Sequence, residues 1–90
     1  MDYKFFNLGQ LTDRDVIEVT ISNATVNLRL MDQTNFDLYK AAKEFSFYGG
    51  VMQVGTHKLP VPRAAHWFVV HDMKDLQGQG AVTAKILARN

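Results

Sequence analysis

Apolar and polar residues alternate with a period of two along most of this chain, and this pattern constrains the fold more than any other feature. In residues 24–30 every second side chain is apolar, which predicts a strand with one buried face and one face in water. The β-branched segment 16–21 precedes it across Ser22-Asn23, a pair typical of turns. We therefore expect these two segments to pair as a β-hairpin.

Further segments also have the composition of strands. They are residues 46–48, 51–54, 57–59, 65–71 and 81–88. Gly49-Gly50 separates the first two, which predicts a hairpin turn where positive φ favours glycine. Pro60 and Pro62 close the third and place it at a sheet edge, because proline cannot donate to a ladder. The fourth is apolar on both faces, so we expect a central strand covered on both sides.

One segment has a helical pattern instead. Residues 34–44 contain good helix formers and neither glycine nor proline, and Thr34 and Asp37 have the spacing of a capping box. The expected apolar face consists of Leu38, Ala41, Ala42 and Phe45. These patterns together predict a mainly β fold, a small antiparallel β-sandwich or open barrel with one short helix.

Composition is that of an ordinary globular domain, with 47% hydrophobic and 21% charged residues. Ninety residues are enough for one domain, spanning 1–90. The chain has no cysteine, which excludes disulfides, thiolate metal sites and thiol catalysis. Its first residues lack the pattern of a secretory signal, and no apolar run approaches the roughly 20 residues that span a bilayer. We expect a cytoplasmic protein without a membrane partner.

Basic residues are concentrated in the second half of the chain. Residues 1–45 hold five basic and seven acidic residues, whereas residues 46–90 hold five basic and two acidic. The candidates for a basic patch are Arg29, Lys58, Arg63 and Lys85. Because no RNP-type or GXXG pattern accompanies them, a nucleic acid or other polyanion is the least favoured partner.

Histidines and carboxylates are the candidates for metal binding or catalysis. His66 and His71 are five residues apart in one expected strand, so they point to opposite faces and cannot share a metal. His57 adds one ligand, whereas Zn²⁺ needs three or four. We therefore expect no metal and no cofactor, although a histidine-dependent enzyme of unknown reaction is the alternative function. Spacing alone identifies no catalytic residue for it.

Three carboxylates lie close together before and within the first expected strand. They are Asp13, Asp15 and Glu18. An acid–base pair needs a raised pKa and a second partner, and nothing in the sequence indicates burial here. We interpret the group as a polar turn and a solvated strand face.

The dipeptide His66-Trp67, where segment 65–71 begins, has two interpretations. In the favoured one, Trp67 belongs to the core. In the other, His66 and Trp67 line a shallow aromatic pocket beside the proline corner and near Tyr48. The candidate binding residues are therefore Tyr48, Arg63, His66 and Trp67.

The order of motifs resembles the DUF1883 family, small bacterial domains of uncharacterised function. The resemblance lies in ATVNLRLMDQTNFDLYKAAKEFSFYGG, then KLPVP, HWFVVHDM and AVTAKIL, and covers residues from about Val16 to Leu87. This chain departs from the family pattern at Ala65, where glycine is usual, and at Thr34-Asn35, where Ser-Asn is commoner. The resemblance implies a compact, mainly β domain and no particular reaction.

Function is therefore expected to be binding rather than catalysis. Relatives joined to TIR-type domains imply an accessory sensing or protein-interaction module, an analogy at the level of the fold. We expect a non-catalytic module that binds an unknown protein or a small ligand. The sequence does not indicate an oligomeric state.

Overall fold

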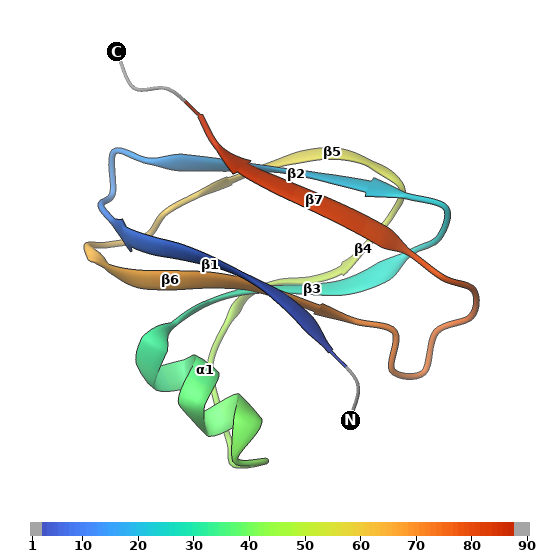
Figure 1. Ribbon diagram of the computed structural model, residues 1–90, viewed down its shortest axis with the longest axis horizontal. Helices are drawn as coiled ribbons and strands as arrows, with labels where there is room; N and C mark the ends of the chain where they lie inside the picture. The colour runs from blue at the N-terminus through green and yellow to red at the C-terminus, as the bar shows by residue number, and fades with distance from the viewer. Residues whose placement is uncertain (1–2, 88–90) are drawn as a thin grey trace.

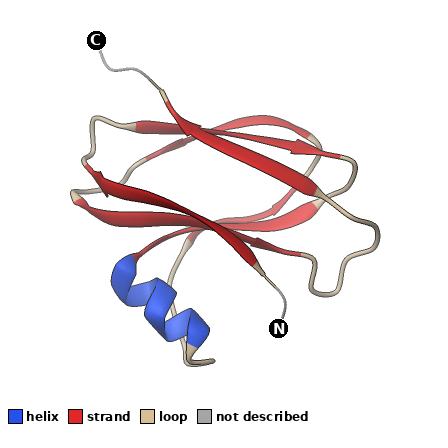
Figure 2. Ribbon diagram, viewed as in Figure 1, coloured by secondary structure: helices blue, strands red, loops and turns tan. Residues whose placement is uncertain are grey.

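Two antiparallel β-sheets pack face to face in the computed structural model, which describes residues 3–87 (Figure 1). The elements are β1 (Lys4–Leu11), β2 (Val16–Ser22), β3 (Val26–Asp32), α1 (Gln33–Lys40), β4 (Tyr48–Met52), β5 (Gly55–Pro60), β6 (Ala65–Asp72) and β7 (Ala81–Ile86). Figure 2 shows the single described helix lying outside the two layers of strands. No helix in the described range is long and apolar enough to cross a membrane.

The first sheet has the strand order β1-β6-β3-β4, and the second has the order β5-β2-β7. Every pairing is antiparallel. Within the described residues, β1, β4, β5 and β7 each pair on one side only, so neither sheet closes into a barrel. The predicted mainly β fold with one short helix is confirmed in its sandwich form.

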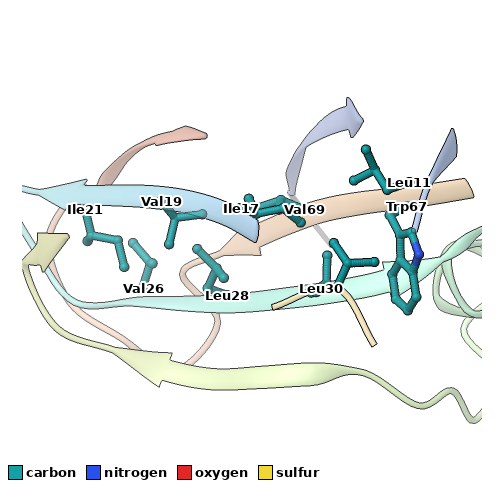
Figure 3. Packing of buried hydrophobic residues seen from close by; sticks show 10 residues of the cluster. Leu11, Ile17, Val19, Ile21, Val26, Leu28, Leu30, Trp67 and Val69 are labelled. Carbon is teal, nitrogen blue, oxygen red and sulfur yellow. The ribbon is translucent and has the colours of Figure 1, made fainter. Parts of the chain in front are cut away.

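The predicted hairpin between segments 16–21 and 24–30 is wrong. β2 belongs to the second sheet and β3 to the first, so the turn between them carries the chain from one layer to the other. Figure 3 shows Val19 of β2 and Leu28 of β3 pointing toward each other across the core. The alternation predicted which faces are buried. It did not predict pairing, because a hairpin and a sheet-to-sheet crossing bury the same faces.

Gly49 and Gly50 do not form a turn. They lie inside β4, which pairs with β3 along its whole length. Both have positive φ, at 124° and 146°. A Cβ on Gly49 would collide with the backbone oxygen of Leu28, whereas one on Gly50 would have open space. Glycine at position 49 therefore permits close approach of two strands, rather than reversing the chain.

The other strands lie close to their expected positions, with one addition. β5 and β6 cover the segments expected at 57–59 and 65–71. β7 covers 81–86 of the segment expected at 81–88; residue 87 is not in a strand, and residue 88 lies outside the described range. β1 has no counterpart in the sequence analysis. Its register with β6 shifts between Asn7 and Gly9, and such a bulge interrupts the period of two.

The helix begins and ends earlier than expected. Asp32 rather than Thr34 is the N-cap, and its carboxylate accepts from the backbone N–H of Asn35. The chain leaves the helix before Ala42, which has a φ of 58°. The buried helix residues are Phe36 and Tyr39, whereas Leu38 is half-buried and Ala41 and Ala42 are exposed; Phe45 packs against this cluster. The predicted cap and most of the predicted apolar face are wrong, because the end of β3 sets the start of the helix.

β6 is the central strand, as predicted. It lies between β1 and β3. Trp67 and Val69 face the second sheet in the main core, and Phe68 and Val70 face α1 in a smaller outer cluster. Trp67 has no exposed surface, which confirms the interpretation of this side chain as part of the core.

We expect Gly49→Ala to destabilise the domain more than Gly50→Ala. Both variants place an alanine at positive φ, which costs about 1–3 kcal/mol. Only Gly49→Ala also forces a Cβ against the Leu28 backbone, adding about 1–3 kcal/mol of overpacking. Urea unfolding of the two variants measures the difference. Equal losses in the free energy of unfolding would contradict the close-approach explanation.

Candidate binding site

Three of the four predicted binding residues meet at one end of the sandwich. Tyr48 begins β4, Trp67 lies near the start of β6, and Arg63 lies in the connection between β5 and β6. The Tyr48 and Trp67 rings meet edge to face with their centroids 6.2 Å apart. The Arg63 guanidinium carbon lies 5.1 Å from the centroid of the Trp67 ring. The indole is therefore covered by an aromatic ring and a cation.

A pocket of about 320 Å³ opens at this place, near the lower end of the range typical of small-molecule sites. It is lined by Leu30, Met31, Asp32, Asn35, Ser46, Phe47, Tyr48, Arg63 and Trp67. Trp67 is fully buried, so it lies beneath the residues that form the accessible surface of the pocket. Phe47 and Tyr48 are 41% and 50% exposed and supply aromatic surface at the rim.

A chain of polar contacts forms one wall of the pocket. The Arg63 guanidinium pairs with Asp32, and the Arg63 carbonyl accepts a hydrogen bond of 3.0 Å from Nε1 of Trp67. The other oxygen of Asp32 accepts from the side-chain amide of Asn35 at 2.9 Å. The Asn35 side-chain oxygen in turn accepts from the Ser46 backbone N–H at 2.8 Å. Helix capping and the position of Arg63 thus depend on the same carboxylate.

His66 does not line this pocket. It precedes Trp67 in β6 and so points to the opposite face of the sheet. There its ring stacks on Phe68, with centroids 5.1 Å apart, and its Nε2 lies 2.6 Å from Oδ1 of Asn7. The period of two that buries Trp67 directs His66 away from it.

Sequence reasoning missed two prominent contributors to the site. Phe47 supplies exposed ring surface beside Tyr48, and Asp32 holds Arg63. The pattern Phe45-Ser46-Phe47-Tyr48 contained a signal, since it places three aromatic residues before the glycines. Asp32 gave no such signal, because its contact with Arg63 joins residues far apart in sequence.

The three histidines lie in different environments. His57 on β5 has its Nε2 2.8 Å from the carbonyl oxygen of Gln53, and His71 is buried facing the second sheet, where it stacks near Phe6. Within residues 3–87, no group of three or more histidine, aspartate or glutamate side chains is arranged to hold a metal ion.

The candidate basic residues are distributed over the molecule and most are paired. Arg29 pairs with Asp72, Arg63 with Asp32, and Lys85 with Glu18. Lys58 lies opposite Glu18 in the β2–β5 register. Because acidic groups accompany these cations, they do not form a single basic surface.

Asp15 is buried, contrary to the expectation of a fully solvated carboxylate group. Its exposed fraction is 1%. One carboxylate oxygen of Asp15 accepts from the backbone N–H of Thr12 at 2.8 Å. The backbone carbonyl of Asp15 accepts from the backbone N–H of Val61 at 3.0 Å. Asp13 is exposed as predicted. Asp15 thus orders the turn between β1 and β2, a role that sequence spacing does not distinguish from a solvated one.

A buried carboxylate connects the helix to the outer face of the first sheet. Oδ1 of Asp72 accepts from the Asn27 side chain at 2.8 Å and the Lys74 backbone N–H at 3.1 Å. Oδ2 accepts from Nη1 of Arg29 at 2.5 Å and the Tyr39 hydroxyl at 3.0 Å. Two strands, the helix and the loop after β6 therefore converge on one side chain.

The network changes the acidity of its members. Burial by itself raises the pKa of Asp72, but hydrogen bonds from Asn27, Lys74 and Tyr39, together with the Arg29 charge, bring this pKa below its ordinary value of 3.8. Burial, followed by the hydrogen bond to Asp72, raises the pKa of Tyr39 to about 12. Folding thus favours an ionised Asp72 and a neutral Tyr39.

The two sheets, one covering helix and one small end pocket define a small β-sandwich domain. The family model for the domain of unknown function DUF1883 matches residues 1–90, and the chain belongs to this family. The resemblance seen in the motifs is therefore confirmed. Comparisons with curated proteins and with solved structures gave no match.

We expect Asp72→Asn to lower the free energy of unfolding at pH 7 by about 2–4 kcal/mol. This is slightly less than for a fully buried pair, because Arg29 remains partly exposed. The ionised Asp72 stabilises the fold fully above pH 3.8. This stabilisation is lost as the pH falls through the pKa of Asp72 in the folded state, which is lower than 3.8. The variant should lack this acid-dependent loss. Asp37→Asn, at an exposed acid of α1, is the control and should leave urea unfolding unchanged.

We expect His71 to weaken the fold at mildly acidic pH. Burial, and then the charge of Lys4, lower the pKa of His71, although Asp72 opposes this shift. The contribution of neutral His71 to the free energy of unfolding is therefore complete above pH 6.5. It declines as the pH falls below that value. Urea unfolding from pH 7 to pH 5 should show the decline in the wild type and in His66→Gln but not in His71→Phe. A decline that persists unchanged in His71→Phe would contradict this assignment.

Proposed function

We propose that this DUF1883 domain is a non-catalytic binding module whose end pocket accepts a planar, hydrogen-bonding group of a protein or a small ligand. One observation carries the proposal: Tyr48 of β4 lines the same pocket as Arg63 and Trp67, which lie later in the chain. We also propose the cytoplasmic location expected from the sequence.

The exposed rings at the rim favour a planar group. Phe47 and Tyr48 keep a large part of their surface in water, and a ring stacked on an aromatic side chain gains about 0.5–1.5 kcal/mol beyond the burial of area. Leu30 and Met31 also border the pocket, although both are buried. The two exposed rings provide apolar contact without a preference for charge.

The polar wall favours a group that both donates and accepts hydrogen bonds. Arg63 offers N–H donors, and Asp32 beside it offers carboxylate oxygens. Because these two charges are already paired, the pocket is suited to a neutral polar group more than to a bare anion. An amide or a heteroaromatic ring has this combination of a flat face and mixed hydrogen-bonding edge.

The same surroundings give less support to the alternatives. No histidine is among the residues that line the pocket, which disfavours a histidine-dependent enzyme at this place. A polyanion would need a continuous basic surface, whereas Arg29, Arg63 and Lys85 each face an acidic partner. We therefore rank small-ligand or partner binding above both.

We expect a fragment library of planar amides and heteroaromatic compounds to contain binders that shift the backbone NMR signals of the pocket segment 46–48. Arg63→Met should weaken a confirmed binder about tenfold, equivalent to about 1.4 kcal/mol. Lys85→Met, which removes another exposed and ion-paired cation, should leave its affinity unchanged. Both variants are first checked for a native unfolding midpoint.

Two results would contradict the proposal. One is the absence of any binder whose shifts map to this pocket. The other is a binder that is equally affected by Arg63→Met and Lys85→Met, because that would indicate nonspecific attraction by charge.

A further inference from the structure

β4 differs from the other three edge strands in the part of the chain that the structure describes. An open strand edge exposes unpaired backbone groups, and proteins usually protect it with charged residues or proline. β1 carries Lys4, β5 carries Lys58 and Pro60, and β7 carries Lys85. β4 has neither charge nor proline, and residues 45–57 contain no lysine, arginine, aspartate or glutamate. This edge therefore lacks the usual protection.

Exposed apolar side chains are concentrated along the same segment. The exposed large hydrophobic residues among those described are Phe5, Phe47, Tyr48, Val51, Val54 and Ile86. Four of the six lie between positions 47 and 54, and Val51 and Val54 are 65% and 56% exposed. A cluster of this kind at one edge marks an interaction surface.

We propose that β4 pairs antiparallel with β4 of a second copy of this chain, so that the first sheets of two molecules form one continuous sheet. The same strand on both copies gives an isologous, two-fold interface, the commonest symmetry of soluble oligomers. The strand offers its backbone to the partner on the side away from β3, which is unpaired within the described residues.

The register of the pairing follows from the sheet geometry. Residues that lie opposite each other in an antiparallel pair share a face. A register centred on Gly50 satisfies this condition and pairs all five residues of β4. It sets Tyr48 opposite Met52 on the face toward the second sheet. On the outer face it sets Val51 opposite Gly49, so that the larger side chain lies across from a residue without one.

Charge is the reason for choosing a second copy as the occupant. Pairing two identical strands brings like charges together wherever the strand is charged, which destabilises the pair. β7 paired with itself would bring two copies of Lys85 into one short ladder. β4 is neutral along its length, so its self-pairing carries no such repulsion. Of the edges described, it is the one best suited to an identical partner.

The experiment is sedimentation velocity of the full chain from micromolar to millimolar concentration. The wild type should change from one to two chains per particle as the concentration rises. Val51→Lys places a charge on each copy's outer face within the interface and should remain monomeric throughout. Ile86→Lys, at an exposed apolar residue of the β7 edge, is the matched control and should dimerise like the wild type. Circular dichroism and urea unfolding confirm that both variants fold.

A distance measurement tests the register itself. The chain has no cysteine, so Gln53→Cys provides a unique position for a spin label just beyond β4. In a register centred on position 50, the two copies of residue 53 are six residue positions apart, about 20 Å along the strands. Pulsed electron paramagnetic resonance should give a distance of this order, extended by the length of the labels.

Three outcomes would overturn the proposal: a wild type that is monomeric at every concentration, a Val51→Lys variant that still dimerises, or labels far more distant than this register allows. Tyr48 belongs both to β4 and to the pocket, whereas Val51 does not line the pocket, so Val51→Lys tests the dimer without changing a residue of the ligand site. A Val51→Lys variant that is monomeric but still binds the fragments would show that the dimer and the ligand site are independent of each other.

Discussion

The burial of β6 on both faces is the constraint on which the rest of this structure depends. Trp67 and Val69 need an apolar layer on one side of the strand, and Phe68 and Val70 need another on the opposite side. Burying each of these aliphatic or aromatic side chains contributes roughly 1.5–3 kcal/mol. The second sheet supplies the first layer and α1 the second, so a single strand requires both the sandwich and its covering helix.

Asp72, at the end of the same strand, fixes the outer layer in its orientation. The short helix α1 packs through Phe36 and Tyr39. This small apolar contact by itself does little to fix the orientation of the helix on the sheet. The hydrogen bond from Tyr39 to Asp72, shared with Arg29, adds a directional contact. A buried carboxylate is costly unless it is fully hydrogen-bonded, and this requirement joins the helix, the sheet and the loop after β6.

The candidate pocket arises where the other end of β6 meets the start of α1. Trp67 is a core residue that lies beneath Arg63, and Arg63 borders the pocket. Asp32 similarly caps the helix and holds the guanidinium. Structural and proposed binding roles thus fall on the same side chains, which explains why no separate signature was visible in the sequence.

The sequence by itself determined which face of β3 is buried, the central position of residues 65–71, the presence of one short helix and the family. These properties are local, since they follow from side-chain periodicity and backbone preference over a few residues. The tertiary structure decided that β2 and β3 lie in different sheets, that Gly49 meets a neighbouring strand, and that Asp32 pairs with Arg63. Each of these depends on which strands become neighbours. That choice is made by the packing of the whole chain, because an alternating strand buries its apolar face equally well against several partners.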